Sequence, residues 1–179
     1  NHTLWNRQDN RIYFYVRADF EAKQGKVDVP CIVRPDGTGL TMLGQFIGGH
    51  PEWEFGSRMI GSVGGKQIIY DVDRQEIAGQ IGTPEILPQP GGDGALSPDG
   101  KWFVSGFRVR RENFYAIVNR GDGAHVRTRG FPVDRWLGGE LRLDPAPCWN
   151  RASNAIAIPA IAPDRERTRQ TFLLRIRRT

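Results

Sequence analysis

The sequence lacks both long apolar runs and long segments free of glycine and proline. It contains 22 glycines and 12 prolines in 179 residues, and the longer segments without either (1–24, 66–78, 107–120 and 164–179) alternate as strands do. This pattern excludes a helical bundle. The longest apolar runs, such as 155–158, cover a few residues, whereas a membrane helix needs roughly 20. We therefore expect a soluble, all-β chain with no membrane span and no visible signal-peptide pattern.

Cysteine and histidine are scarce. Cys31 and Cys148 lie far apart in strand-like apolar runs, so their spacing fits neither a disulfide framework nor a zinc site. We expect both thiols to be buried, and they leave the cellular compartment open. Of the three histidines, His125 follows a glycine-rich turn and is expected on the surface.

Blocks of like charge are also absent. The net charge is +5 with a sequence pI near 9.6, and the positive charge comes mainly from arginines spread along predicted strands and loops. A solvated strand face or exposed loop explains this pattern. The alternative is an anionic ligand or acidic sugar, because the guanidinium group matches a carboxylate. We do not expect nucleic acid as a partner.

A repeat runs along the chain. Four short motifs, 2–5, 50–53, 93–96 and 146–149, each precede a turn and end in a large apolar residue: Trp5, Trp53, Leu96 and Trp149. Their spacing of roughly 40–50 residues is typical of propeller blades. We expect the three tryptophans to pack in the core between neighbouring blades.

Strand-like runs follow each motif and its turn. The first runs cover 11–16, 58–63, 101–107 and 155–160, the second 29–34, 67–72, 113–119 and 171–176, and the last 41–45, 77–81 and 125–128. With the entry motif as innermost strand, each unit is a four-stranded antiparallel sheet. The blades are predicted at 1–48, 49–91, 92–143 and 144–179, forming one propeller segment.

The fourth predicted blade lacks its outer strand. An unpaired edge with an apolar face is a liability, so we expect several more blades upstream in a larger ring. A four-blade ring closed without that strand is the alternative.

Candidate functional residues gather at the blade entries. His2 and His50 occupy the same place in their repeats, and first strands of propeller blades line the central channel. The two imidazoles could share a metal or a substrate proton, or simply cap the strand. Asp144, just before the last motif, is a metal ligand or a cap by the same reasoning.

Two motifs resemble known families. Residues 96–102 (LSPDGKW) resemble the signature of TolB-like propeller repeats. The histidine-led entries at 2–5 and 49–53 resemble those of oligogalacturonate lyases, which are propellers of about seven blades. This resemblance implies a manganese-dependent β-elimination on pectin-derived uronides, in which metal and arginine neutralise a carboxylate and histidine removes a proton.

Carried over residue by residue, the resemblance makes His50 a metal ligand and Asp144 a possible one, with Arg142 on the carboxylate and His2 as catalytic base. The last entry departs from the family, because residues 144–147 read DPAP where a histidine-rich cluster would supply ligands. We therefore predict an incomplete manganese site and a protein that binds an acidic saccharide at the channel mouth. The alternatives are an active uronide lyase and a TolB-like protein-interaction scaffold.

Overall fold

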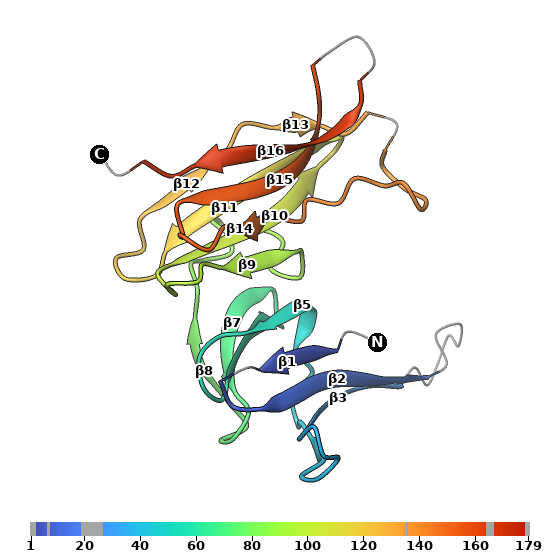
Figure 1. The fold of residues 1–179 in the computed structure, drawn as a ribbon, viewed down its shortest axis with the longest axis vertical. Coiled ribbons are helices and arrows are strands. Elements are labelled where there is room, and N and C mark those ends of the chain that lie inside the picture. Colours follow the sequence, from blue (N-terminus) through green and yellow to red (C-terminus); the bar gives the residue numbers. More distant parts are fainter. Residues whose placement is uncertain (1–2, 7, 19–26, 135, 164–166, 178–179) are drawn as a thin grey trace.

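The chain folds into four antiparallel sheets in a computed structural model that describes residues 3–6, 8–18, 27–134, 136–163 and 167–177 (Figure 1). Across these ranges there is no helix, and hence none that could cross a membrane. The all-β, propeller-type fold predicted from the repeats is confirmed.

Each sheet is built from consecutive strands. Sheet 1 contains β1 (Leu4–Asn6), β2 (Arg11–Ala18), β3 (Val27–Val33) and β4 (Thr41–Met42). Sheet 2 contains β5 (Gly48–Trp53), β6 (Arg58–Val63), β7 (Lys66–Asp71) and β8 (Glu76–Gln80). Sheet 3 contains β9 (Gly94–Leu96), β10 (Trp102–Val109), β11 (Glu112–Asn119) and β12 (His125–Arg127), and β13 (Phe131–Pro132) also pairs with β11. Sheet 4 contains β14 (Cys148–Trp149), β15 (Ala155–Ile161) and β16 (Arg169–Arg175).

Polar side chains fix the turn after each innermost strand. In sheet 3, the Asp99 carboxylate accepts hydrogen bonds from the Ser97 hydroxyl and the Lys101 backbone N–H. In sheet 4, the Asn150 side-chain oxygen accepts from the backbone N–H groups of Asn154 and Ala155. These local bonds hold the chain reversal that starts the second strand.

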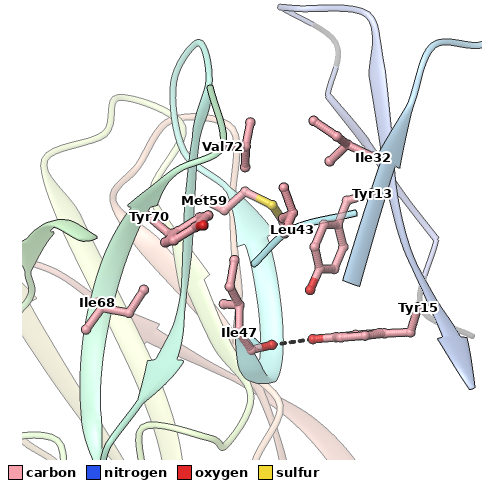
Figure 2. Close-up of a cluster of buried hydrophobic side chains, with 9 residues drawn as sticks. All are labelled: Tyr13, Tyr15, Ile32, Leu43, Ile47, Met59, Ile68, Tyr70 and Val72. Carbon is pink, nitrogen blue, oxygen red and sulfur yellow. Dashed lines mark hydrogen bonds between the residues drawn. The ribbon is translucent and has the colours of Figure 1, made fainter. Parts of the chain in front are cut away.

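Buried side chains fill the space between successive sheets. Between sheets 1 and 2, Figure 2 shows Tyr13, Met59 and Tyr70 converging with the aliphatic side chains around them. The Tyr15 hydroxyl donates to the Ile47 carbonyl there, joining the two sheets. Similar clusters lie between sheets 2 and 3 and between sheets 3 and 4, so each sheet packs face to face on the next.

The four sheets form an open arc. The innermost strands contact one another in the order β1, β5, β9, β14, but no element of sheet 1 contacts an element of sheet 4 in the described ranges. In Figure 1, sheets 1 and 2 occupy the lower half and sheets 3 and 4 the upper half. Within the described residues, sheet 4 has three strands, as predicted.

Two sequence expectations about this arc are wrong. Trp53 and Trp149 pack between sheets, but Trp5 is 56% exposed because no sheet of the described residues covers that side of sheet 1. Cys31 is buried as expected, whereas Cys148 is exposed because it lies on the uncovered side of sheet 4.

Candidate functional site

A cleft of about 400 Å³ lies where β9 and β14 begin and β10 ends. It brings together three of the four residues singled out in the sequence. His50, Arg142 and Asp144 line it, while His2 lies outside the described residues. The polar side chains of this entry cleft are His50, Gln89, Asp93, Arg108, Arg142 and Asp144.

The floor of the entry cleft is made by closely packed backbone. A Cβ atom at Gly106 would lie 1.6 Å from the Pro145 carbonyl oxygen, and one at Gly92 would lie 2.5 Å from the Gly106 carbonyl oxygen. Such distances are far below van der Waals contact, so both positions require glycine. Glycine therefore allows the segments before β9 and β14 to close onto the end of β10.

His50 and Asp93 form one side of the entry cleft. His50 Nδ1 lies 3.4 Å from Asp93 Oδ1, with about half of the imidazole side chain exposed. Asp93 comes from the entry of the third repeat and His50 from the entry of the second, so the pair joins neighbouring sheets. The sequence analysis did not single out Asp93, although its repeat position matches that of His50.

Arg142 and Asp144 form the other side. Arg142 Nε lies 2.7 Å from Asp144 Oδ2, and Arg108 Nη2 lies 3.9 Å from Asp144 Oδ1. In this arrangement one carboxylate faces two guanidinium groups, which leaves net positive charge on that side of the cleft.

Arg108 is held much more firmly than Arg142. Its Nε donates to Asn113 Oδ1 at 2.9 Å and its two Nη groups donate to the Leu137 and Leu143 carbonyls. Asn113 is fully buried and also donates to the Leu143 carbonyl at 3.0 Å. These bonds occupy all three nitrogens of Arg108, so it fixes the 137–143 segment beside the cleft. From the sequence, Arg108 is one of the arginines that a solvated face or an anionic ligand would explain, and neither explanation predicts this role.

The described residues do not fit the manganese site that the resemblance implies. No group of three or more histidine, cysteine or acidic side chains lies close enough to hold a metal among them. His50 faces Asp93, whereas Asp144 is engaged by arginines. A protein-held Mn²⁺ needs several oxygen or nitrogen ligands around one point, and the described residues do not supply them.

Glu52 lies on the same strand as His50, two residues further on. Burial raises the pKa of the Glu52 carboxyl to about 7, and a hydrogen bond from the Leu96 backbone and the charge of Arg120 only partly oppose this effect. No hydrogen-bond partner for Glu52 Oε1 is found in the described ranges. Glu52 therefore adds a titratable group to the innermost strands below the entry cleft.

A larger cleft of about 940 Å³ lies at the opposite end of sheets 3 and 4, lined by Lys101, Trp102, Arg120 and Arg177 among others. It contains none of the residues predicted from the repeat entries. The smaller entry cleft is therefore the better candidate site, because it combines a histidine, two arginines and two aspartates from three entry segments.

Comparison with known proteins supports the fold. No protein-family model matches the chain, and no curated protein matches it in sequence. Among solved structures, an oligogalacturonate lyase in complex with manganese superposes with a TM-score of 0.65 at 15% identity, covering 98% of this chain and 48% of the lyase.

TolB from Acinetobacter baumannii superposes with a TM-score of 0.59 at 15% identity, covering 97% of this chain and 40% of TolB. The chain thus spans less than half the length of either protein. The likeness to lyase and TolB propellers expected from the sequence is confirmed at the level of the fold, and the chain is a four-sheet segment with β-propeller architecture.

Proposed function

We propose that the entry cleft binds an acidic saccharide, with Arg142 as the group that contacts a sugar carboxylate. The observation that carries this proposal is that Arg142, Asp144 and His50 line one cleft. This cleft lies where the innermost strands β9 and β14 begin. The net charge of +5 favours an anionic partner.

The free donors of Arg142 support this role. Its Nε is used by Asp144, but no described residue accepts a hydrogen bond from its Nη groups, and the side chain is exposed. A carboxylate can therefore bind these two nitrogens. Arg108 adds positive charge, and its hydrogen bonds to Asn113, Leu137 and Leu143 make it a positioning residue.

The His50–Asp93 pair supplies polar groups for sugar hydroxyls. His50 is half-exposed and Asp93 is partly exposed, so both can exchange a water contact for a hydroxyl of the ligand. Arginine on one side and this pair on the other would bind a carboxylate and its neighbouring hydroxyls at once.

A manganese-dependent uronide lyase is the second candidate. It uses His50 and Asp144 as metal ligands, Arg142 on the carboxylate and His2 as base. The superposition on a manganese-bound lyase favours it, but the described residues lack a full ligand set. A protein-interaction scaffold, as the TolB-like repeat suggests, would need none of these groups.

One pair of assays separates these functions. The purified chain is titrated with oligogalacturonate by calorimetry, and product formation with manganese is followed by ultraviolet absorbance of the unsaturated sugar. We expect saturable binding without product, weakened about tenfold by Arg142→Ala because a charge-assisted hydrogen bond is lost. Arg74→Ala is the matched control, since Arg74 is an exposed arginine on the far turn of sheet 2.

Chelator-sensitive product would establish the lyase and overturn the binding-only proposal. Absence of binding in folded protein would overturn both and leave the scaffold.

A further inference from the structure

Four exposed arginines lie along the outer edge of sheet 3. Arg110 and Arg111 form the turn between β10 and β11, Arg127 ends β12, and Arg129 lies between β12 and β13. The other edge of β11 pairs with β10, so β12 and β13 follow one another along the same outer edge (Figure 1). We call these four residues the arginine edge.

The arginine edge begins beside the entry cleft. Arg108 lines that cleft near the end of β10, and the turn that holds the first two arginines follows two residues later. β13 pairs with β11 next to this turn, whereas β12 pairs with it further along. Arg127 is opposite Ala116, so at about 3.3 Å per residue it lies roughly 17 Å from the turn. The arginine edge therefore extends the positive charge of the entry cleft along sheet 3.

Aromatic rings hold two of these arginines in place. Arg127 Cζ lies 5.6 Å from the centroid of the Phe114 ring, and Arg129 Cζ lies 5.8 Å from that of Phe131. A ring face attracts a guanidinium group but accepts none of the N–H bonds that lie in the guanidinium plane. No described residue accepts a hydrogen bond from either side chain. Each arginine thus has donors available for an anion.

Carboxylates near the arginine edge do not neutralise it. Asp134 is paired with Arg167, and only its backbone carbonyl accepts a hydrogen bond from Arg111. Glu112 is exposed and lies against Gly130, where a Cβ atom would be 2.7 Å from its carboxyl carbon. Among the described residues, Glu112 forms no ion pair. Four guanidinium groups therefore face one unpaired carboxylate, and the arginine edge carries net positive charge.

We propose that the arginine edge binds the continuation of a saccharide chain held in the entry cleft, so that the ligand is an acidic polysaccharide and not a single sugar. This inference rests on the proposed function of the entry cleft. Arg142 contacts one carboxylate there, while Arg129 and Arg127 contact carboxylates of sugars further along the chain. A single sugar cannot reach from the cleft to Arg127. Because all these contacts belong to one ligand, each further contact is intramolecular and raises the overall affinity.

Dependence on ligand length tests the proposal. Calorimetry compares a galacturonate trisaccharide with a decasaccharide at two salt concentrations. We expect the decasaccharide to bind at least about tenfold more tightly to the wild type. The double variant Arg127→Gln/Arg129→Gln should lose most of this gain and depend less on salt, because fewer counterions are released on binding. It should bind the trisaccharide as the wild type does, which also shows that its entry cleft is folded.

Arg74→Gln/Arg151→Gln is the matched control. It removes the same charge from two exposed arginines, one on the turn between β7 and β8 and the other on the turn between β14 and β15. We expect this control to keep the full difference between the two saccharides. An equal loss in both double variants would show that net charge explains the effect and would overturn the proposal.

The remaining outcomes separate this inference from the proposed function. Equal affinities for the two saccharides overturn the inference and leave the entry cleft as a site for a short ligand, whereas no binding of either overturns both. If Arg142→Ala leaves decasaccharide binding unchanged but Arg127→Gln/Arg129→Gln weakens it, the arginine edge is supported and the entry cleft is not. Decaglutamate carries carboxylates without sugar rings, and binding as tight as that of the decasaccharide would overturn the saccharide in favour of an acidic peptide.

Discussion

Arg142 Nε and Asp144 Oδ2 lie 2.7 Å apart, on two residues separated by one position in the segment that leads into sheet 4. Asp144 thus partly neutralises the arginine that we propose as the ligand-binding group. The pair is exposed to solvent, and the negative charge of Asp144 weakens the attraction between Arg142 and a ligand carboxylate that binds its Nη groups.

Asp144→Asn should therefore tighten the binding of oligogalacturonate. Asparagine keeps the shape and removes the competing charge, and we expect about three- to tenfold higher affinity at low ionic strength, with a smaller gain in high salt. Calorimetric titration at two salt concentrations measures this effect. Glu76→Gln, an exposed carboxylate beside Arg74, should change nothing. Weaker binding by Asp144→Asn would show instead that this carboxylate contacts the ligand or a metal.

Gly106→Ala should destabilise the protein strongly. The added Cβ would lie 1.6 Å from the Pro145 carbonyl oxygen, so the 144–146 segment must move, at a cost of about 2–4 kcal/mol in the free energy of unfolding. Urea denaturation measures the change. Gly138→Ala is the control, because its Cβ would meet no atom within 4 Å. Equal stability of the two variants would refute the tight packing of the floor.

Glu52 should make stability fall as pH rises. Its pKa is raised from the ordinary 4.5 to about 7, so the folded chain binds this proton more tightly than the unfolded chain does. The stabilising contribution of the protonated form is complete below about pH 4.5 and is lost as pH rises through about 7. Glu52→Gln should therefore stabilise the protein at pH 8 by up to roughly 3 kcal/mol and have little effect at pH 4.

Urea unfolding of the wild type and Glu52→Gln at pH 4, 6 and 8 gives this difference directly. Other carboxyls titrate in both proteins, so they cancel in the comparison. A difference that does not change with pH would show that the pKa of Glu52 is the same in the folded and the unfolded chain.

Trp149→Phe should cost about 1 kcal/mol beyond the change in ring size, because the Ala95 carbonyl loses its indole donor. Trp53→Phe should cost a similar amount through Leu4. Thermal or urea unfolding in dilute solution tests both. Trp5→Phe should be nearly neutral, because no described residue accepts a hydrogen bond from the Trp5 indole, and a cost equal to that of Trp149→Phe would mean that this indole has a partner.

The fold was predictable because its information is local and repeated. Each turn uses residues that bond to their own backbone, as Asp99 and Asn150 do, and each strand alternates in polarity. The meeting of His50, Arg142 and Asp144 was predictable for a related reason, since equivalent positions of successive blades come to the same end of the sheets.

Other features depend on tertiary contacts that carry no sequence signal. Arg108 looks like a surface arginine on an alternating strand, and its fixed position depends on Asn113 opposite it and on the Leu143 carbonyl far along the chain. The exposure of Trp5 could not be predicted from its motif either. The equivalent motif at 50–53 ends in Trp53, which is packed between sheets.

The construction of every sheet from consecutive strands has a consequence for how the molecule unfolds. Paired strands are close in sequence, and in the described residues each sheet contacts only the sheets beside it. In solenoid proteins with such contacts, the stability of each repeat depends on its own folding and on the interfaces with its nearest neighbours. In the described residues, sheets 2 and 3 contact a sheet on each side, and sheets 1 and 4 contact a sheet on one side. Opening should therefore start at the ends of the arc and move inward, so that amide protons of β7 and β10 exchange with solvent long after those of β1 and β14.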